Sequence, residues 1–303
     1  MSHHADPVGM PAQHVARDLG RLRARMGRLY PLGDERIAVP GAAQPYAITL
    51  PASPDDPLDH FASTAGRRRH TRTGTGAAGT ADTVAAAAVE ARLAVSAGIH
   101  MPYWALLWPS GLALAETLLK QHKGACHAPL QERHEDERHP PLLGRRVLEL
   151  GCGLGVTAIA ALLCGADLWA ADCYAEALLF ARHNSLRNAG RAPRTLLLDW
   201  RGEAGRAACL AAGPFDALLA ADVLYEPENI TPLLALVPRL LAPGGVFWLA
   251  EPGRKVSLAF VAAAHAAGWR DEQTVYAREW PPDGDYARVT VHRYSLPQSD
   301  AGD

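Results

Sequence analysis

The sequence has little net charge, few cysteines and no long apolar run, and each shortage excludes a class of protein. Thirty Lys and Arg residues against 32 Asp and Glu residues leave a formal net charge of −2, so no global field favours nucleic acid or an anionic membrane. No stretch approaches the roughly 18 apolar residues of a membrane-spanning helix, and the N-terminus lacks the apolar core of a signal peptide. The five cysteines form no Cys-x-x-Cys pair and fit a reducing compartment. We therefore expect a cytoplasmic protein without a membrane partner.

The chain has enough apolar sequence for one large domain with an appendage, since 49% of its 303 residues are hydrophobic. Residues 1–98 are expected to form an N-terminal extension that is partly disordered or linker, because the stretch GRRRHTRTGTGAAGTADT within it cannot build a core. Residues 99–296 are expected to form the main domain, and residues 297–303 a tail.

One segment of the extension has the spacing of an amphipathic helix. Its apolar positions are Leu19, Leu22, Met26 and Leu29, with Arg21, Arg25 and Arg28 between them. We expect the apolar stripe to pack on the main domain, although an arginine-rich helix could also serve RNA, a membrane surface or a protein partner. A strand is expected at residues 45–50.

A second stretch, residues 121–141, is densely charged and contains four histidines and one cysteine: His122, Cys126, His127, His134 and His139. Their irregular spacing does not match the ligand spacing of a metal site. We therefore expect an exposed loop here and no bound metal.

From residue 143 onward, short apolar strands alternate with helices. Strands are expected at residues 145–150, 167–172, 195–200, 215–225 and 246–251, and helices at residues 155–165, 175–190, 228–245 and 255–269. Two more strands, at residues 272–280 and 287–296, follow without a helix between them. This order predicts a mostly parallel α/β sheet with helices on both faces, an antiparallel C-terminal hairpin, and a ligand site beyond the carboxyl ends of the strands.

The first of these strands runs into a glycine loop, RVLELGCGLG at residues 146–155. A dinucleotide fold needs its third glycine at position 156, which is valine, and no Lys-Ser or Lys-Thr follows as in a phosphate-binding loop. Gly151, Gly153 and Gly155 instead predict a backbone that approaches a ligand closely without holding a pyrophosphate. Glu149, just before them, could receive a cationic group.

Acidic residues follow the next two strands as well. Asp172 is placed where a carboxylate can accept both hydroxyls of a ribose. Asp199 could accept the exocyclic amine of an adenine while the indole of Trp200 packs on its ring. Each acid alone could be a helix cap or turn residue, but a sugar, a base and an ammonium group together describe S-adenosylmethionine.

Several motifs resemble those of the class I, seven-β-strand S-adenosylmethionine-dependent methyltransferases. They are VLELGCGLG at residues 147–155, AAD at 170–172, LLDW at 197–200 and ADVLY at 221–225. The segment MPYWALLWPSGLALAETLL, together with DVLYEPE and EPGR, is similar to the protein-lysine methyltransferases of that class, the group of the electron-transfer-flavoprotein β-subunit lysine methyltransferases and their nicotinamide N-methyltransferase-like relatives.

The resemblance, over residues 99–296, implies a Rossmann-like fold, the cofactor S-adenosylmethionine and methylation of lysine side chains. Electron-transfer flavoprotein β subunit or a ribosomal protein would be the partner. The long front extension and the charged insert at residues 121–141 depart from the family pattern. These departures concern the partner, not the cofactor.

The expected substrate end of the site is the motif of Asp222 and Tyr225. By the resemblance these two residues are catalytic: Asp222 would hold the incoming amine, and Tyr225 would shape an aromatic channel for a lysine side chain. A helix-capping Asp with a packing Tyr is the structural alternative. Trp108 would roof the cofactor, with Tyr103 and Trp104 beside it, unless this tryptophan-rich segment is plain core.

Other residues near the expected site have roles of their own, and the same site could serve other functions. Glu251 and Arg254, after the fifth strand, are expected to contact the target protein, and Cys152 to fill space only. The same cofactor residues would serve a small-molecule N-methyltransferase acting on a nicotinamide-like amine, or an inactive binding module. Nucleic-acid methylation is disfavoured because the fourth strand ends in Asp-Val-Leu-Tyr and not in an Asn-Pro-Pro-Tyr motif.

Overall fold

The computed structural model describes residues 12–53, 56–57, 102–127, 142–279 and 286–297, and within them the main feature is a seven-stranded sheet of order β5-β4-β3-β6-β7-β9-β8. Its strands are β3 (Arg146–Leu150), β4 (Asp167–Asp172), β5 (Arg194–Leu197), β6 (Phe215–Ala221), β7 (Leu241–Glu251), β8 (Arg270–Glu279) and β9 (Tyr286–Ser295). The first five strands in the spatial order pair in parallel, and β9 pairs antiparallel with both β7 and β8. The expected Rossmann-like, mostly parallel seven-stranded sheet with a C-terminal antiparallel hairpin is confirmed.

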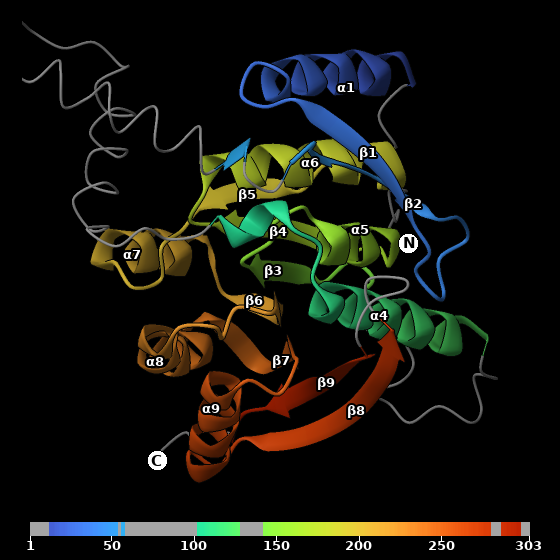
Figure 1. The fold of residues 1–303 in the computed structure, drawn as a ribbon. Helices are drawn as coiled ribbons and strands as arrows, with labels where there is room; N and C mark the ends of the chain where they lie inside the picture. Colours follow the sequence, from blue (N-terminus) through green and yellow to red (C-terminus); the bar gives the residue numbers. More distant parts are fainter. Residues whose placement is uncertain (1–11, 54–55, 58–101, 128–141, 280–285, 298–303) are drawn as a thin grey trace, which may run out of the picture.

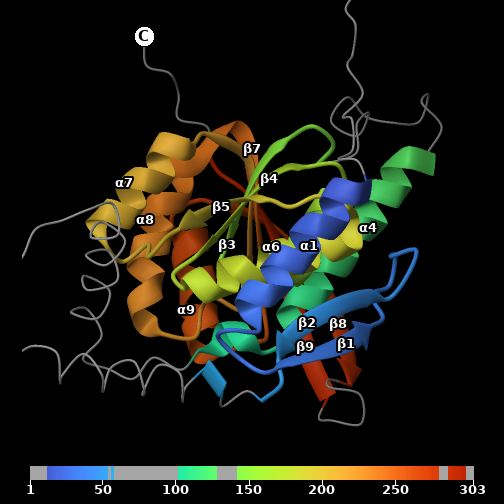
Figure 2. The ribbon, with the colours of Figure 1, turned by 90° about the horizontal axis from the view of Figure 1, so that it is seen from above.

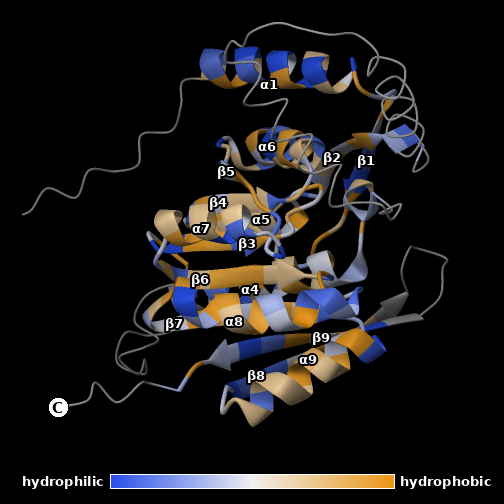
Figure 3. Cartoon of the chain, turned by 90° about the vertical axis from the view of Figure 1, so that its left-hand side faces the viewer, coloured by the Kyte–Doolittle hydropathy of each residue, from blue (hydrophilic) through white to orange (hydrophobic). Residues whose placement is uncertain are grey.

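Helices cover both faces of this sheet (Figures 1 and 2). On one face lie α4 (Pro109–His127), α5 (Val156–Leu163) and α6 (Ala175–Ala189), and on the other α7 (Glu203–Ala212), α8 (Ile230–Leu240) and α9 (Lys255–Ala266). Side chains of a strand alternate between the two faces of the sheet. Val147 therefore packs into the core on the side of α4, α5 and α6, and Leu148 into the core on the side of α7, α8 and α9. Strand β6 is almost wholly apolar in Figure 3, as expected for a strand buried on both sides.

The structure differs from the expected elements at several places. The strands expected at residues 195–200 and 215–225 end earlier, at Leu197 and Ala221, and a strand at Leu32–Ile37 was not expected. Helix α7 was not expected; it is only ten residues long and has Gly205 in its first turn. Strand β7 begins at Leu241, where the Pro-Gly-Gly sequence favoured a turn. Helix α4 continues to His127, so the start of the charged insert is helical and not a loop, while residues 128–141 lie outside the described residues.

The front of the chain packs against α6 as a helix and a hairpin. Helix α1 (Ala12–Met26) contacts α6 and buries Leu22 and Met26, which confirms the packing of the apolar stripe. Strands β1 (Leu32–Ile37) and β2 (Tyr46–Pro51) form an antiparallel pair, and β2 confirms the strand expected at residues 45–50. The glycine- and threonine-rich linker lies outside the described residues, and the domain boundary near residue 98 stays a prediction.

A side-chain amide ties this hairpin to the glycine loop. The Asn184 side chain accepts a hydrogen bond from the Thr49 amide at 2.8 Å and donates to the Thr49 carbonyl at 3.0 Å. It also donates to the carbonyl of Leu154 at 2.9 Å. Since all of these atoms are buried, each bond avoids the cost of an unpaired polar group.

Two negative findings apply to the part of the chain that the structure describes. None of its helices is both long and apolar enough to span a bilayer. No group of three or more His, Cys, Asp or Glu side chains there is arranged to hold a metal ion.

Candidate active site

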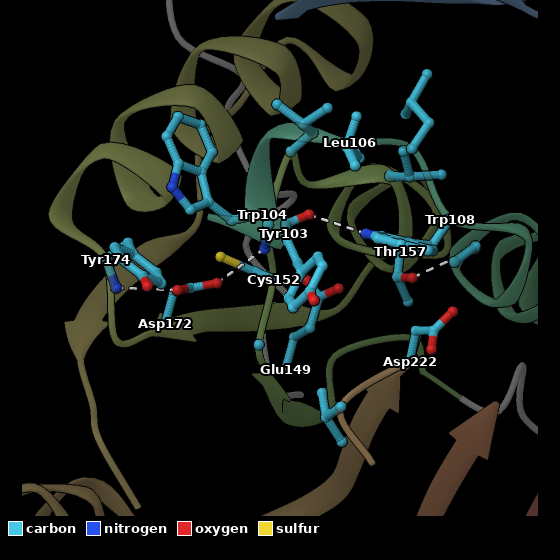
Figure 4. A pocket seen from close by; sticks show the side chains of 18 of the residues that line it. Tyr103, Trp104, Leu106, Trp108, Glu149, Cys152, Thr157, Asp172, Tyr174 and Asp222 are labelled. Carbon is cyan, nitrogen blue, oxygen red and sulfur yellow. Dashed lines mark hydrogen bonds between the residues drawn. The ribbon is translucent and has the colours of Figure 1, made fainter. Parts of the chain in front are cut away.

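A pocket opens beyond the carboxyl ends of β3, β4 and β6, under the segment that precedes α4 (Figure 4). Of the ten residues singled out above for the cofactor or the reaction, eight line it: Trp108, Glu149, Gly151, Gly153, Asp172, Trp200, Asp222 and Tyr225. Gly155 and Asp199 do not. The fold therefore collects, in one pocket, side chains that are as far apart in the sequence as residues 108 and 225.

The glycine loop is bare where it borders the pocket. Gly151 has a φ of +72°, and a Cβ there would lie 2.7 Å from the Val223 side chain. Gly153 has a φ of +50°, and a Cβ there would lie 3.3 Å from the Trp104 carbonyl oxygen. The positive φ angles favour glycine, and both residues line the pocket, so backbone borders the pocket at this loop.

Gly155 serves a different purpose. It precedes α5 with a φ of +83°, and a Cβ at this position would come within 2.9 Å of the Ala181 backbone in α6. This glycine therefore lets two helices pack closely, which is a structural requirement. Its predicted contact with the cofactor stays a prediction.

Glu149 lies in the floor of the pocket with a carboxylate that is almost fully buried, at 2% exposure. Burial raises the pKa of Glu149 to about 8, and the negative charge of Asp172 adds to this effect. The Oε2 atom has no hydrogen-bond partner among the described residues. A buried carboxylate oxygen without a partner is costly, so this oxygen is a place where a cationic ligand group would be stabilised.

Asp172, at the end of β4, supports the loop as well as lining the pocket. Its Oδ2 accepts a hydrogen bond from the Gly153 amide at 3.0 Å, and its Oδ1 accepts one from the Tyr174 amide at 2.9 Å. In Figure 4 the Glu149 side chain lies between Asp172 and Asp222. The Asp172 carboxylate is thus fixed by two backbone amides at the edge of the pocket.

Trp200 and Asp199, after β5, face different ways. The Trp200 ring lines the pocket, and its Nε1 donates to the side chain of Asn229 at 3.1 Å. Asp199 instead accepts hydrogen bonds from the amide and the guanidinium of Arg201, at 3.0 and 3.1 Å. The structure therefore brings the indole to the pocket but not the neighbouring carboxylate, whose contact with an adenine stays a prediction.

Asp222 is the only non-glycine residue with a positive φ, 56°, in the described part of the chain. Such a conformation costs about 1–3 kcal/mol, and strain of this kind is often found at functional sites. The carboxylate is buried and accepts hydrogen bonds from Ser110 at 3.2 Å and from the Arg254 guanidinium at 2.9 and 3.2 Å. Burial raises the pKa of Asp222, and the charge of Arg254 opposes that rise.

Three aromatic rings that line the pocket contact one another. The Tyr103 ring meets Tyr225 edge-on at 5.2 Å and Trp108 edge-on at 5.8 Å. Trp108 Nε1 donates to the Tyr103 carbonyl at 2.8 Å, which fixes the indole. Tyr103 and Tyr225 keep 36% and 38% of their surface exposed, so this aromatic rim can be reached from solvent.

Trp104 differs from its neighbours because it belongs to the core. Only 6% of its surface is exposed, and its ring packs on Phe180 at 5.3 Å and on Tyr30 at 6.0 Å. The structural alternative for the tryptophan-rich segment is therefore right for Trp104, although one side of this residue lines the pocket.

The expected contact of Glu251 with a target protein is wrong. Glu251 is 3% exposed, and its carboxylate accepts hydrogen bonds from the Gly253 amide at 2.6 Å and from the Ser257 hydroxyl. Its buried carboxylate stabilises the turn before α9. The pairing of Arg254 with Asp222 and the support from Ser110 were not expected, and no motif in the sequence links residues so far apart.

The chain matches one family model and is similar to several known proteins. A family model described as lysine methyltransferase matches residues 98–263. The chain is similar to a ubiquinone biosynthesis O-methyltransferase of Methylocella silvestris, with 29% identity over 152 residues, which are 49% of this chain and 57% of that protein. It is similar to the electron transfer flavoprotein beta subunit lysine methyltransferase of Danio rerio, with 42% identity over 66 residues, 22% of this chain and 19% of that protein.

A third relative is a ribosomal protein L11 methyltransferase of Pseudomonas putida, with 34% identity over 147 residues, which are 46% of this chain and 44% of that protein. The chain therefore spans less than two thirds of the length of each of these three relatives.

Proposed function

The chain belongs to the lysine methyltransferase family, and from that membership we propose that it is an S-adenosylmethionine-dependent N-methyltransferase that acts on lysine side chains of a protein. The cofactor of the family is S-adenosylmethionine. The observation that carries the proposal is one pocket that collects a buried, partly unpaired carboxylate, a glycine loop, a second buried carboxylate and a partly exposed aromatic rim.

The residues of the pocket fit the cofactor chemically. Glu149 offers an unpaired carboxylate oxygen to the ammonium group of the methionine part. Gly151 and Gly153 leave backbone that a ligand can approach. Asp172 offers carboxylate oxygens to the ribose hydroxyls, and the Trp200 ring offers an apolar wall to the base.

When bound, S-adenosylmethionine supplies a methyl group on a positively charged sulfur, which an amine can attack without a nucleophile from the protein. The task of this chain is therefore to bind and align the amine. Asp222 would accept a hydrogen bond from the amine nitrogen, and the rings of Tyr225 and Tyr103 would flank the aliphatic side chain that carries it. Cationic and aliphatic groups both pack favourably on such rings.

A protein substrate is favoured by the shape of the acceptor end. Tyr103 and Tyr225 are more than one-third exposed, so a long side chain can enter from outside while the rest of its protein stays on the surface. Two of the relatives are named for a protein, electron transfer flavoprotein beta subunit and ribosomal protein L11. These two proteins are the first candidates to test as acceptors.

The test is to incubate the purified protein with S-adenosylmethionine labelled in its methyl group and lysate of the source organism, and then to separate proteins from small molecules. Label on a protein band, absent with Asp222→Ala, supports the proposal. Label in the small-molecule fraction alone would move the function to the nicotinamide-like alternative. The variant Asp167→Ala is a matched control, because this exposed aspartate pairs with Arg194 away from the pocket.

A further inference from the structure

Arg254 touches two walls of the acceptor end without lining the pocket. Its guanidinium reaches Oδ1 of Asp222 through Nη2 at 2.9 Å and through Nε at 3.2 Å. The same guanidinium lies over the Trp108 ring, with Cζ 5.6 Å from the centroid. Asp222 and Trp108 line the pocket and Arg254 does not, so the arginine contacts both residues from outside the pocket.

The turn that carries Arg254 is fixed by buried groups. Gly253, with a φ of +81°, donates its amide to the Glu251 carboxylate at 2.6 Å. The Ser257 hydroxyl bonds to the same carboxylate and lies 2.8 Å from the Arg254 carbonyl oxygen. Arg254 then immediately precedes α9. This bracing means that the guanidinium is presented to Asp222 by a preformed turn, so less side-chain freedom is lost in the pairing.

Three groups from three packed elements face the Asp222 carboxylate. Arg254, from the start of α9, and Ser110, from α4, stabilise its charged form, whereas the negative charge of Glu251, at the end of β7, opposes it. The ion pair with Arg254 is asymmetric in exposure, with 5% of the Asp222 side chain and 40% of the Arg254 side chain accessible. The arginine therefore compensates a carboxylate that burial would otherwise drive towards its neutral form.

Resting on the proposed function, we propose that Arg254 is a positioning residue that keeps Asp222 ionised and charge-compensated, so that the acceptor nitrogen binds as a neutral amine and is not trapped as an ammonium ion. Only the neutral amine has the lone pair that forms the new carbon–nitrogen bond as the bond from sulfur to methyl breaks. Without Arg254, an arriving ammonium ion would become the counterion that keeps Asp222 ionised, so the acceptor would keep its proton and its pKa would rise. The paired guanidinium cancels that attraction, while Asp222 still accepts a hydrogen bond from the amine.

Charge compensation allows the acceptor to become a nucleophile without a protein side chain that takes its proton. A lysine side chain in water has a pKa near 10.4, so it must lose a proton before transfer. A desolvated position beside a neutral ion pair lowers that pKa, because the charged form is disfavoured there. Charge compensation by Arg254 thus favours release of that proton to solvent water before transfer, after which the amine lone pair forms the bond to the methyl carbon and the electron pair of the broken bond stays on sulfur.

The first experiment measures the ionisation of Asp222 itself and needs no methyl acceptor. The protein is labelled with carbon-13 in the aspartate carboxyl groups, and the Asp222→Asn variant identifies the Asp222 resonance by its loss. Arg254→Gln should move the titration of this resonance to higher pH, and Arg254→Lys should largely restore it. An unchanged titration in Arg254→Gln would overturn the proposal.

Arg293 offers a matched control for these variants. Its guanidinium pairs with Glu272 at 3.1 Å and lies 5.7 Å from the centroid of the Trp248 ring, so it makes the same two kinds of contact outside the pocket. Arg293→Gln should leave the Asp222 resonance unmoved. Thermal unfolding of all variants shows that each is folded at the temperature of the titration.

The second experiment measures methyl transfer against pH, using the lysate protein that the wild type labels. Arg254→Gln should move the half-maximal pH upwards and lower the rate at pH 7 by about tenfold, which is the loss of neutral amine when its pKa rises by one unit. Arg254→Lys should keep the wild-type profile. A lower rate with an unmoved profile would reduce Arg254 to a structural support and overturn the proposal. If the wild type labels nothing, the proposed function fails, while the carboxyl titration still decides the state of Asp222.

Discussion

Glu149 provides a prediction whose size follows directly from its environment. The carboxyl group is 2% exposed, one of its oxygens has no partner in the described structure, and its pKa is raised to about 8. The unliganded protein therefore holds Glu149 protonated at pH 7. If the ammonium group of the cofactor binds to the carboxylate, that proton must leave when the ligand arrives.

The raised pKa of Glu149 sets the size of the proton release and of the pH dependence of binding. At pH 7, about nine-tenths of the Glu149 groups are protonated before binding, so close to one proton per site should be released. The apparent affinity should rise by about tenfold between pH 6 and pH 7, because each pH unit below the pKa costs about 1.4 kcal/mol of deprotonation. Above pH 8 this dependence should disappear.

Isothermal titration calorimetry with S-adenosylhomocysteine measures both quantities. This product keeps the ammonium group of the cofactor and reacts with no acceptor. Titrations in two buffers of different ionisation enthalpy give the number of protons released. Glu149→Gln should bind more weakly at pH 8, with no proton release and no rise in affinity from pH 6 to pH 7. Wild-type binding that releases no proton and has a flat pH profile would refute the assignment of the ammonium group to Glu149.

Three further predictions concern the pocket. Asp222→Ala should abolish methyl transfer while calorimetry gives an S-adenosylhomocysteine affinity close to that of the wild type, and normal transfer by this variant would remove Asp222 from the acceptor side. Asp172→Ala should weaken S-adenosylhomocysteine binding by about 1–3 kcal/mol, because hydrogen-bond acceptors for the ribose and the loop are lost, and an equal affinity would contradict the ribose contact. Gly151→Ala should lose cofactor binding because its Cβ would meet Val223 at 2.7 Å. Gly144→Ala, with a φ of +70° but open space around it, should keep binding, so equal effects of the two glycine variants would show that the clash is unimportant.

The stability of the unliganded protein should also reflect Glu149. Its folded-state pKa is raised above its ordinary value of 4.5, so its contribution to stability is fully present below pH 4.5 and is lost as the pH rises through 8. Glu149→Gln should therefore gain thermal stability over the wild type at pH 8 but not at pH 4. A wild-type protein with a higher melting temperature than Glu149→Gln at pH 8 would contradict the raised pKa of Glu149.

The central strands of the sheet were predictable because they are buried on both faces. A buried parallel strand reads as a short apolar run, and DLWAAD at residues 167–172 became β4 with the expected bounds. Helix α7 was missed because it is short and begins with a glycine in its first turn, Gly205, which disfavours a helix. The Pro-Gly-Gly sequence at residues 243–245 favoured a turn, but Gly244 and Gly245 lie inside β7.

The candidate site was predictable to the level of strand ends and no further. A residue that follows a strand in such a sheet can be placed near the pocket, but the direction of its side chain depends on neighbours. Asp199 turns to Arg201, two residues along the chain, while Trp200 turns to the pocket. The pairing of Asp222 with Arg254 joins side chains that only the folded turn before α9 brings together.

The central claim is that this chain methylates the side-chain nitrogen of lysine in a protein. The most direct measurement is tandem mass spectrometry of source-organism proteins after incubation with the purified enzyme and S-adenosylmethionine that carries a deuterated methyl group. The account predicts a deuterated methyl group on the ε-nitrogen of a lysine, present with the wild type and absent with Asp222→Ala. A deuterated methyl group found only on oxygen, or only on a small molecule, would contradict it.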